Sequence, residues 1–211
     1  MARDDWFRRT TWSAADAKEF FARLKRSRPS SKAQYLRIQA HTLAETRQDA
    51  LSRVALELLQ QLFAEFPESP ELASAHLQAA RCQDKLGDIQ SALSHFRLSL
   101  EALAKRPNHD PGTALEYPWF VARRELEDEY DAALDVLKRA HLAFPIQALK
   151  AAAIRALIAS ARGDRQAAQY AQEALDAAGL RQSSFRYHRG LGLVGEEYAP
   201  YIRHLQSLVA A

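Results

Sequence analysis

The sequence predicts an all-α protein, and three observations favour this fold class. Alanine and leucine, which favour helices, number 40 and 28 among the 211 residues, whereas valine and isoleucine, which favour strands, total 11. Apolar residues recur with the period of an amphipathic helix along most of the chain. Serine, proline and glycine interrupt this pattern at intervals of a typical helix length. The composition therefore argues against an enzyme built on a β-sheet.

The first expected helix begins after Ser13. Ser13 and Asp16 form the pattern of a capping box, in which each side chain binds the backbone N–H of the other residue. Phe20 and Leu24 then follow at helical spacing on one face. Pro29 is expected to end this helix, because proline lacks the N–H group that a helix interior needs.

Stop signals divide the rest of the chain into further helices. Pro67, Gly87 and Pro107 each follow an apolar periodic stretch that has to end there. The acidic run at 125–131 indicates a helix start rather than a metal or catalytic site, because carboxylates stabilise the positive end of a helix dipole. The expected helices span residues 32–45, 48–66, 70–86, 88–105, 115–126, 129–144, 147–162, 164–178 and 196–209.

One pattern recurs in every second helix, which indicates stacked antiparallel helix pairs. Ala55, Ala92, Ala133 and Ala167 each begin a helix face on which small or apolar residues follow at offsets of four and seven. These four alanines are 37, 41 and 34 residues apart. A repeat of about 20 to 50 residues is typical of helical arrays in which each unit packs on its neighbours.

These residues resemble the tetratricopeptide repeat family, and residues 73–100 match it best, with Gly87-Asp88 at the turn and Ala92 and Phe96 in the second helix. The resemblance implies a TPR-like α-solenoid of about four antiparallel helix pairs in a single domain. An N-terminal cap is expected over 1–32, the repeats over 33–178, and a C-terminal loop and capping helix over 179–211. The chain is also similar to short uncharacterised bacterial members of this family, which implies no activity.

The sequence shows no motif for catalysis, a cofactor or a metal. Gly190, Gly192 and Gly195 have dinucleotide-loop spacing, but that motif needs a βαβ unit, so we expect a turn that packs Leu191, Leu193 and Val194 on the last repeat. The seven histidines lack metal-binding spacing, and Cys82 is expected to be a small buried apolar residue. We therefore predict no enzyme activity, no cofactor and no metal; an enzyme that uses the loop around His188 is the weaker alternative.

A curved array of helix pairs presents its first helices on the inner face, where we expect a groove that binds another protein or a peptide. Arg37, Arg81 and Arg123 would form a row of guanidinium groups suited to partner carboxylates. The alternative is that these arginines pair with Asp84 and nearby glutamates of the chain itself. The predicted groove residues are Gln34, Arg37, His41, Ser74, Leu77, Arg81, Asp84, Trp119 and Arg123.

These features predict a noncatalytic protein–protein interaction module, acting as an adaptor or as an immunity protein that neutralises a toxin. The alternative is a nucleic-acid-binding protein that uses the basic residues of Arg23–Arg37 with Tyr35 beside them, although a net charge of +3 is small for such a role. The single cysteine and the lack of a signal or membrane-spanning segment favour the cytoplasm.

Overall fold

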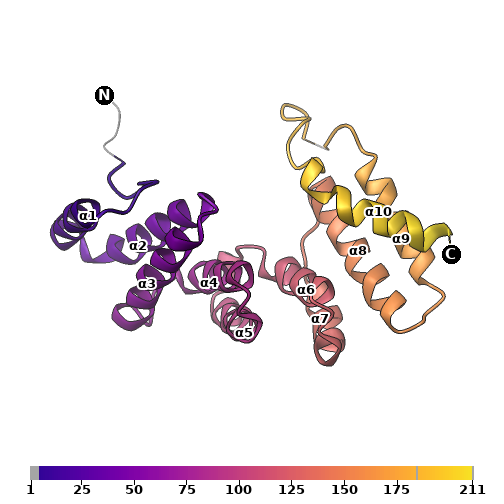
Figure 1. Cartoon of the computed structure of the whole chain (residues 1–211), viewed down its shortest axis with the longest axis horizontal. Coiled ribbons are helices and arrows are strands. Elements are labelled where there is room, and N and C mark those ends of the chain that lie inside the picture. Colours follow the sequence, from indigo (N-terminus) through magenta and orange to yellow (C-terminus); the bar gives the residue numbers. More distant parts are fainter. Residues whose placement is uncertain (1–4, 184, 211) are drawn as a thin grey trace. The chain divides into compact units, whose positions relative to one another are not determined.

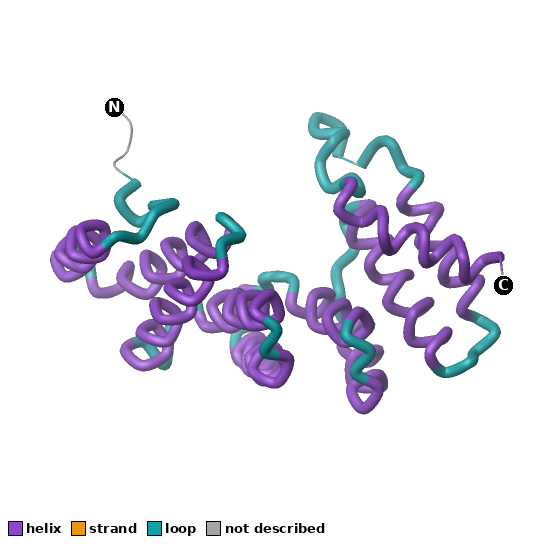
Figure 2. Tube along the Cα trace, viewed as in Figure 1, coloured by secondary structure: helices purple, strands orange, loops and turns teal. Residues whose placement is uncertain are grey.

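The protein is all-helical in the part that the computed structural model describes, residues 5–183 and 185–210 (Figure 1). Ten α-helices and short 3-10 turns make up this part, and no strand occurs in it (Figure 2). The predicted all-α class is therefore confirmed. The chain divides into two compact units, Met1–Thr113 and Ala114–Ala211. The single continuous array of repeats stays a prediction.

In the N-terminal unit, three consecutive helix contacts follow the chain order. α2 packs on α3, α3 on α4, and α4 on α5. The helices α2/α3 and α4/α5 are the first two pairs that the sequence predicts. The helices of this unit are α1 (Ala14–Arg26), α2 (Pro29–Glu45), α3 (Asp49–Glu65), α4 (Leu72–Leu86) and α5 (Ile89–Lys105).

Local signals set most of the helix ends in this unit. The capping box is confirmed, since the Asp16 N–H donates to Ser13 Oγ at 3.1 Å and the Ser13 N–H donates to Asp16 Oδ2 at 2.8 Å. Gly87 ends α4 with a left-handed φ of 84°. Pro29 does not end α1 as expected but opens α2, because the first position of a helix needs no N–H donor.

An aromatic cluster covers the start of the N-terminal unit. Phe20 is fully buried, and its ring centroid lies 5.3 Å from that of Trp6 and 5.4 Å from that of Trp12. Tyr35 on α2 packs on Phe7 at 4.6 Å. The cluster joins the residues before α1 to the core that α2 and α3 form.

A buried hydrogen bond joins α4 to α5. Phe96 on α5 is almost fully buried, whereas the fully buried Ala75 and Ala79 of α4 belong to the core with α2 and α3. Ser99 on α5 donates from Oγ to the backbone oxygen of Ala73 at 2.7 Å, so the buried hydroxyl is satisfied across the pair.

The C-terminal unit is built around α8, whose residues 151–154 are all buried. α8 packs on α9, and α9 packs on α10. α8/α9 is the fourth helix pair that the sequence predicts. The helices of this unit are α6 (Thr113–Arg123), α7 (Tyr130–Leu137), α8 (Pro145–Ala161), α9 (Ala167–Ala178) and α10 (Ala199–Ala210).

α7 is shorter than the expected helix 129–144. It ends at Leu137, and Phe144 is extended with φ −123° and ψ 151°. A proline disfavours helical geometry in the residue before it, so Pro145 keeps Phe144 extended and itself becomes the first residue of α8.

The glycine loop before α10 is anchored to the start of α8. Gly192 has φ 70°, and its carbonyl oxygen accepts a hydrogen bond from the Ile146 N–H at 2.9 Å. Leu193 and Val194 are half-buried, as expected for a packed turn. Leu191 is 52% exposed, so its expected packing on the last repeat is wrong.

Candidate functional site

A small hollow between α2 and α4 gathers the basic side chains of the N-terminal unit. It has a volume of about 190 Å³ and lies where two of the predicted groove residues, His41 and Arg81, come together. The residues that line it are His41, Ala44, Glu45, Arg47, Ser52, Gln78, Arg81, Cys82 and Lys85. We call this feature the basic hollow.

Positive charge dominates the basic hollow. Arg47, Arg81 and Lys85 line it, and Glu45 is the one carboxylate among the described residues that do so. Lys85 Nζ donates to Ser52 Oγ at 3.2 Å and forms an ion pair with Asp49 at 3.6 Å, while Arg47 and Arg81 are exposed to solvent. An anionic group that enters the hollow therefore meets an excess of cations.

The turn after α2 places Arg47 at the basic hollow. Arg47 has a left-handed φ of 60°, and its N–H donates to the carbonyl oxygen of Ala44 at 3.1 Å. A residue with a side chain seldom adopts this conformation, so helical spacing alone gave no signal for Arg47.

Arg37 joins α2 to α4 rather than lining the basic hollow. Its Nε donates to the carboxylate of Glu71, at the N-terminus of α4. Gln78 on α4 also binds it when the amide NH2 faces the Arg37 carbonyl oxygen at 3.2 Å and the amide oxygen faces the guanidinium at 3.0 Å. The alternative that these arginines pair within the chain therefore holds for Arg37.

Two of the predicted groove residues are core residues, which corrects their assignment to an open groove. Leu77 is 2% exposed and Trp119 is 6% exposed. The ring centroid of Trp119 lies 4.9 Å from that of Tyr201, and the Arg123 guanidinium lies 5.8 Å from the centroid of the Trp119 ring. Both residues of α6 thus belong to the interior contacts of the C-terminal unit.

The remaining predicted residues do not line the basic hollow. Gln34 is exposed on α2, whereas Ser74 and Asp84 are half-buried on α4. Sequence reasoning missed Gln78 and Lys85, which do line it. The signal for them was present, because positions 78, 81 and 85 share one face of α4 at offsets of three and four residues.

Cys82 lines the basic hollow, and its thiol is unreactive. Burial raises its pKa to about 11, and the side chain is 4% exposed. The thiolate is the nucleophilic form of cysteine, so this thiol is poorly reactive near neutral pH. The prediction that Cys82 is a buried apolar residue is confirmed.

A histidine pair links α4 to α5 on another side of the N-terminal unit. The Nδ1 atoms of His76 and His95 lie 3.1 Å apart, and the His76 ring stacks on Phe63 with centroids 4.0 Å apart. Burial and the neighbouring His95 lower the pKa of His76 to about 4. Burial also lowers the pKa of His95, which the charge of Asp88 partly opposes.

We expect this pair to make the fold sensitive to acid. A folded-state pKa below the unfolded value gives stability that is present above the unfolded pKa and lost as the pH falls through the folded one. Between about pH 7 and about pH 5, the free energy of unfolding should fall by about 1 kcal/mol because of His76, after allowance for its partial exposure. Urea unfolding of the wild type and of His76→Phe at both pH values measures this difference.

The matched control is His204→Phe, since His204 is exposed on α10, outside the N-terminal unit. This variant should lose as much stability as the wild type between the two pH values. An equal loss in His76→Phe would show that the buried pair does not cause it.

Two arginines of the predicted nucleic-acid patch form ion pairs within the chain. Arg23 forms an ion pair with Glu19 at 2.9 Å, and Arg37 is bound to Glu71. Arg26 and the paired Arg23 still line an open hollow of about 340 Å³ together with two aromatic residues. Its lining residues are Trp6, Arg23, Arg26, Ser27 and Tyr35.

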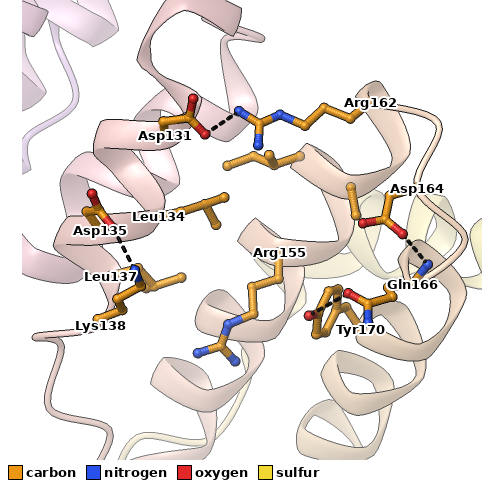
Figure 3. Close-up of a pocket in the computed structure, with 12 residues that line it drawn as sticks. Asp131, Leu134, Asp135, Leu137, Lys138, Arg155, Arg162, Asp164, Gln166 and Tyr170 are labelled. Carbon is orange, nitrogen blue, oxygen red and sulfur yellow. Dashed lines mark hydrogen bonds and ion pairs between the residues drawn. The ribbon is translucent and has the colours of Figure 1, made fainter.

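A larger hollow of about 520 Å³ lies in the C-terminal unit (Figure 3). Helices α7, α8 and α9 and the turn before α9 supply its walls, and we call it the α7–α9 hollow. Sequence reasoning did not single it out, because its walls come together only when α7 packs beside α8. Its lining residues are Asp131, Leu134, Asp135, Leu137, Lys138, Arg155, Ile158, Ala159, Arg162, Asp164, Gln166 and Tyr170.

The acidic run before α7 is engaged in contacts within the chain. Tyr117 Oη donates to Glu129 at 2.7 Å, and Arg162 donates to Asp131 at 2.8 Å. Among the described residues, no three histidine, cysteine, aspartate or glutamate side chains are grouped so as to hold a metal ion.

Comparison of the chain with protein-family models, with curated proteins and with solved structures finds no match. Within the described part of the chain, no helix has both the length and the apolar character to cross a bilayer.

Proposed function

We propose that this chain is a noncatalytic helical-repeat protein that binds an acidic segment of another protein through the basic hollow. The observation that carries the proposal is the gathering of Arg47, Arg81 and Lys85 around one concave site, with Glu45 as the one described carboxylate lining it. Guanidinium groups suit this role because they bind carboxylates through two parallel hydrogen bonds.

The helix pairs support a TPR-like α-solenoid as the architecture of this binding protein. α2/α3, α4/α5 and α8/α9 each pack as neighbours in sequence and in space. The basic hollow lies between α2 and α4, which are the first helices of two successive pairs. First helices are the ones that line the inner face of such an array, so the position of the hollow agrees with the proposed groove.

An adaptor or a toxin-neutralising immunity protein is the narrower form of this proposal. Both roles need a binding surface and no catalytic group. The one cysteine, buried and with a raised pKa, suits a reducing compartment such as the cytoplasm. A gene for a secreted toxin beside the coding gene would support the immunity role.

The double variant Arg47→Glu/Arg81→Glu tests the proposal. The tagged full chain is used to capture proteins from cells that encode it, and the captured proteins are identified and quantified by mass spectrometry. A partner that the wild type retains should bind the double variant at least about tenfold more weakly, because two cations at the hollow become anions.

Arg53→Glu is the matched control, since Arg53 is exposed on α3 and does not line the basic hollow. It should retain the same partner as the wild type. Equal capture by the double variant would show that the hollow is not the binding surface, and capture of nothing by the wild type would count against an interaction module.

Nucleic-acid binding is the second candidate, and the hollow at Trp6, Arg23, Arg26 and Tyr35 favours it. Two cations beside two aromatic rings offer contacts to phosphates and to a base. Titration with a short single-stranded RNA at about 50 mM and about 200 mM salt tests this candidate, because phosphate contacts weaken steeply with salt. No binding at the lower salt concentration would exclude it.

A further inference from the structure

The α7–α9 hollow contains one charged side chain that the fold leaves unmatched. Arg155, on α8, forms no hydrogen bond, ion pair or ring contact with any residue that the structure describes, although its side chain is half-buried. Figure 3 shows its side chain extended away from Asp131, Arg162 and Asp164, and no dashed line joins it to another side chain drawn there. A partly desolvated guanidinium has a strong tendency to bind an anion.

The carboxylates of the hollow do not meet this need, because each already has a partner. Two are bound by other cations and one caps the turn before α9 (Figure 3). These contacts are Arg162 with Asp131 at 2.8 Å, Lys138 with Asp135 at 2.6 Å, and the Gln166 N–H with Asp164 at 2.9 Å. Three cations and three carboxylates line the hollow, so its net charge is zero, but Arg155 is the one lining cation that forms no ion pair with a described carboxylate.

The wall beside Arg155 is apolar. Leu134 on α7 is half-buried and offers apolar surface to the hollow, whereas Leu137, Ile158 and Ala159 also line it but are buried by the chain itself. The volume of about 520 Å³ falls within the range of about 300 to 1,000 Å³ that is common for ligand sites. This combination suits an aliphatic side chain with a carboxylate close to it.

We propose that the α7–α9 hollow binds an acidic segment of another protein. An aspartate or glutamate of that segment pairs with Arg155, and an aliphatic side chain next to it packs on Leu134. The argument for this occupant is charge complementarity, since the carboxylate supplies the anion and the neighbouring side chain covers the apolar wall.

This surface is separate from the basic hollow and does not depend on it. Two of its three helices, α7 and α9, are the second helices of their predicted pairs, whereas the basic hollow lies on the first helices α2 and α4. The two proposals can therefore fail independently of each other.

Selection from a phage library of random short peptides on the immobilised full chain tests the proposal. The wild type should enrich peptides in which aspartate or glutamate stands next to leucine, isoleucine or valine. A synthetic copy of the most enriched peptide is then titrated by fluorescence polarisation. Arg155→Gln should weaken its binding about ten- to hundredfold, as expected for the loss of a charged hydrogen-bonded pair.

Three variants separate this role from general damage to the fold. Arg165→Gln removes the same charge from an exposed residue that does not line the hollow and should bind the peptide as the wild type does. Arg155→Glu should instead bind the peptide in which lysine replaces the acidic residue. Arg47→Glu/Arg81→Glu should leave the peptide affinity unchanged, because those residues belong to the basic hollow.

Several outcomes would overturn the proposal. Enrichment of no peptide, or of peptides without an acidic residue, shows that the hollow does not recognise an acidic segment. Equal affinity of the peptide for Arg155→Gln and the wild type shows that Arg155 is not the anchor. Binding of free hexanoate as tightly as the peptide shows that the hollow takes a small aliphatic acid instead.

Discussion

Replacement of Phe20 by alanine is expected to lower the free energy of unfolding by about 4 kcal/mol. Phe20 is fully buried, and its ring packs at 5.3 Å from Trp6, 5.4 Å from Trp12 and 5.3 Å from Phe21. Removing it leaves a cavity between α1 and the residues that precede it, and several aromatic contacts are lost together. Guanidinium unfolding followed by far-ultraviolet circular dichroism measures the change.

Phe21→Ala is the matched control, because it deletes the same ring from the neighbouring position of α1. Phe21 is 39% exposed, and we expect a loss of no more than about 1 kcal/mol. Similar losses in the two variants would contradict the view that the aromatic cluster is an interior packed around Phe20.

Replacement of Gly192 by alanine is expected to lower the free energy of unfolding by about 3 kcal/mol. This is the second-largest loss of stability that we predict. A Cβ atom at Gly192 would lie 2.5 Å from Cβ of Phe144, and the φ of 70° disfavours any side chain. The loop cannot move away easily, because the Gly192 carbonyl oxygen is bound to the Ile146 N–H at 2.9 Å. Denaturant unfolding of the full chain gives the loss.

Gly190→Ala provides the comparison for this loop. A Cβ atom at Gly190 would have no other atom within 4 Å, so the stability should change by less than about 0.5 kcal/mol. If both alanine variants unfold at the same denaturant concentration, the close approach of the loop to α8 does not contribute to stability.

The sequence allowed most of the helices to be predicted, because their signals are local. The capping pair of Ser13 and Asp16 and the terminal Gly87 act within one helical turn. Pro29 was expected to end one helix but begins the next, for an equally local reason. Proline stops one helix and is also favoured as the first residue of the next, and the sequence does not distinguish these two roles.

The candidate sites were predicted less well, because helical spacing does not separate a groove from a core. Leu77 and Arg81 are four residues apart on α4, yet Leu77 is buried and Arg81 is exposed. Trp119 is an aromatic residue of a type that is common in binding sites. In the structure its ring packs on that of Tyr201, which lies far along the chain. Such burial depends on which helix arrives beside the residue, and no local pattern records it.

The sequence by itself therefore determined that this protein is helical and where most of its helices begin and end, since hydrogen bonds and caps within a few residues decide both. The tertiary structure alone decided which charges remain available. It binds Arg37 to Glu71 across two helices and pairs Arg162 with Asp131, but it leaves Arg155 without a described partner. The physical reason is that residues far apart in the sequence form an ion pair only when packing brings their charged groups within about 4 Å of each other.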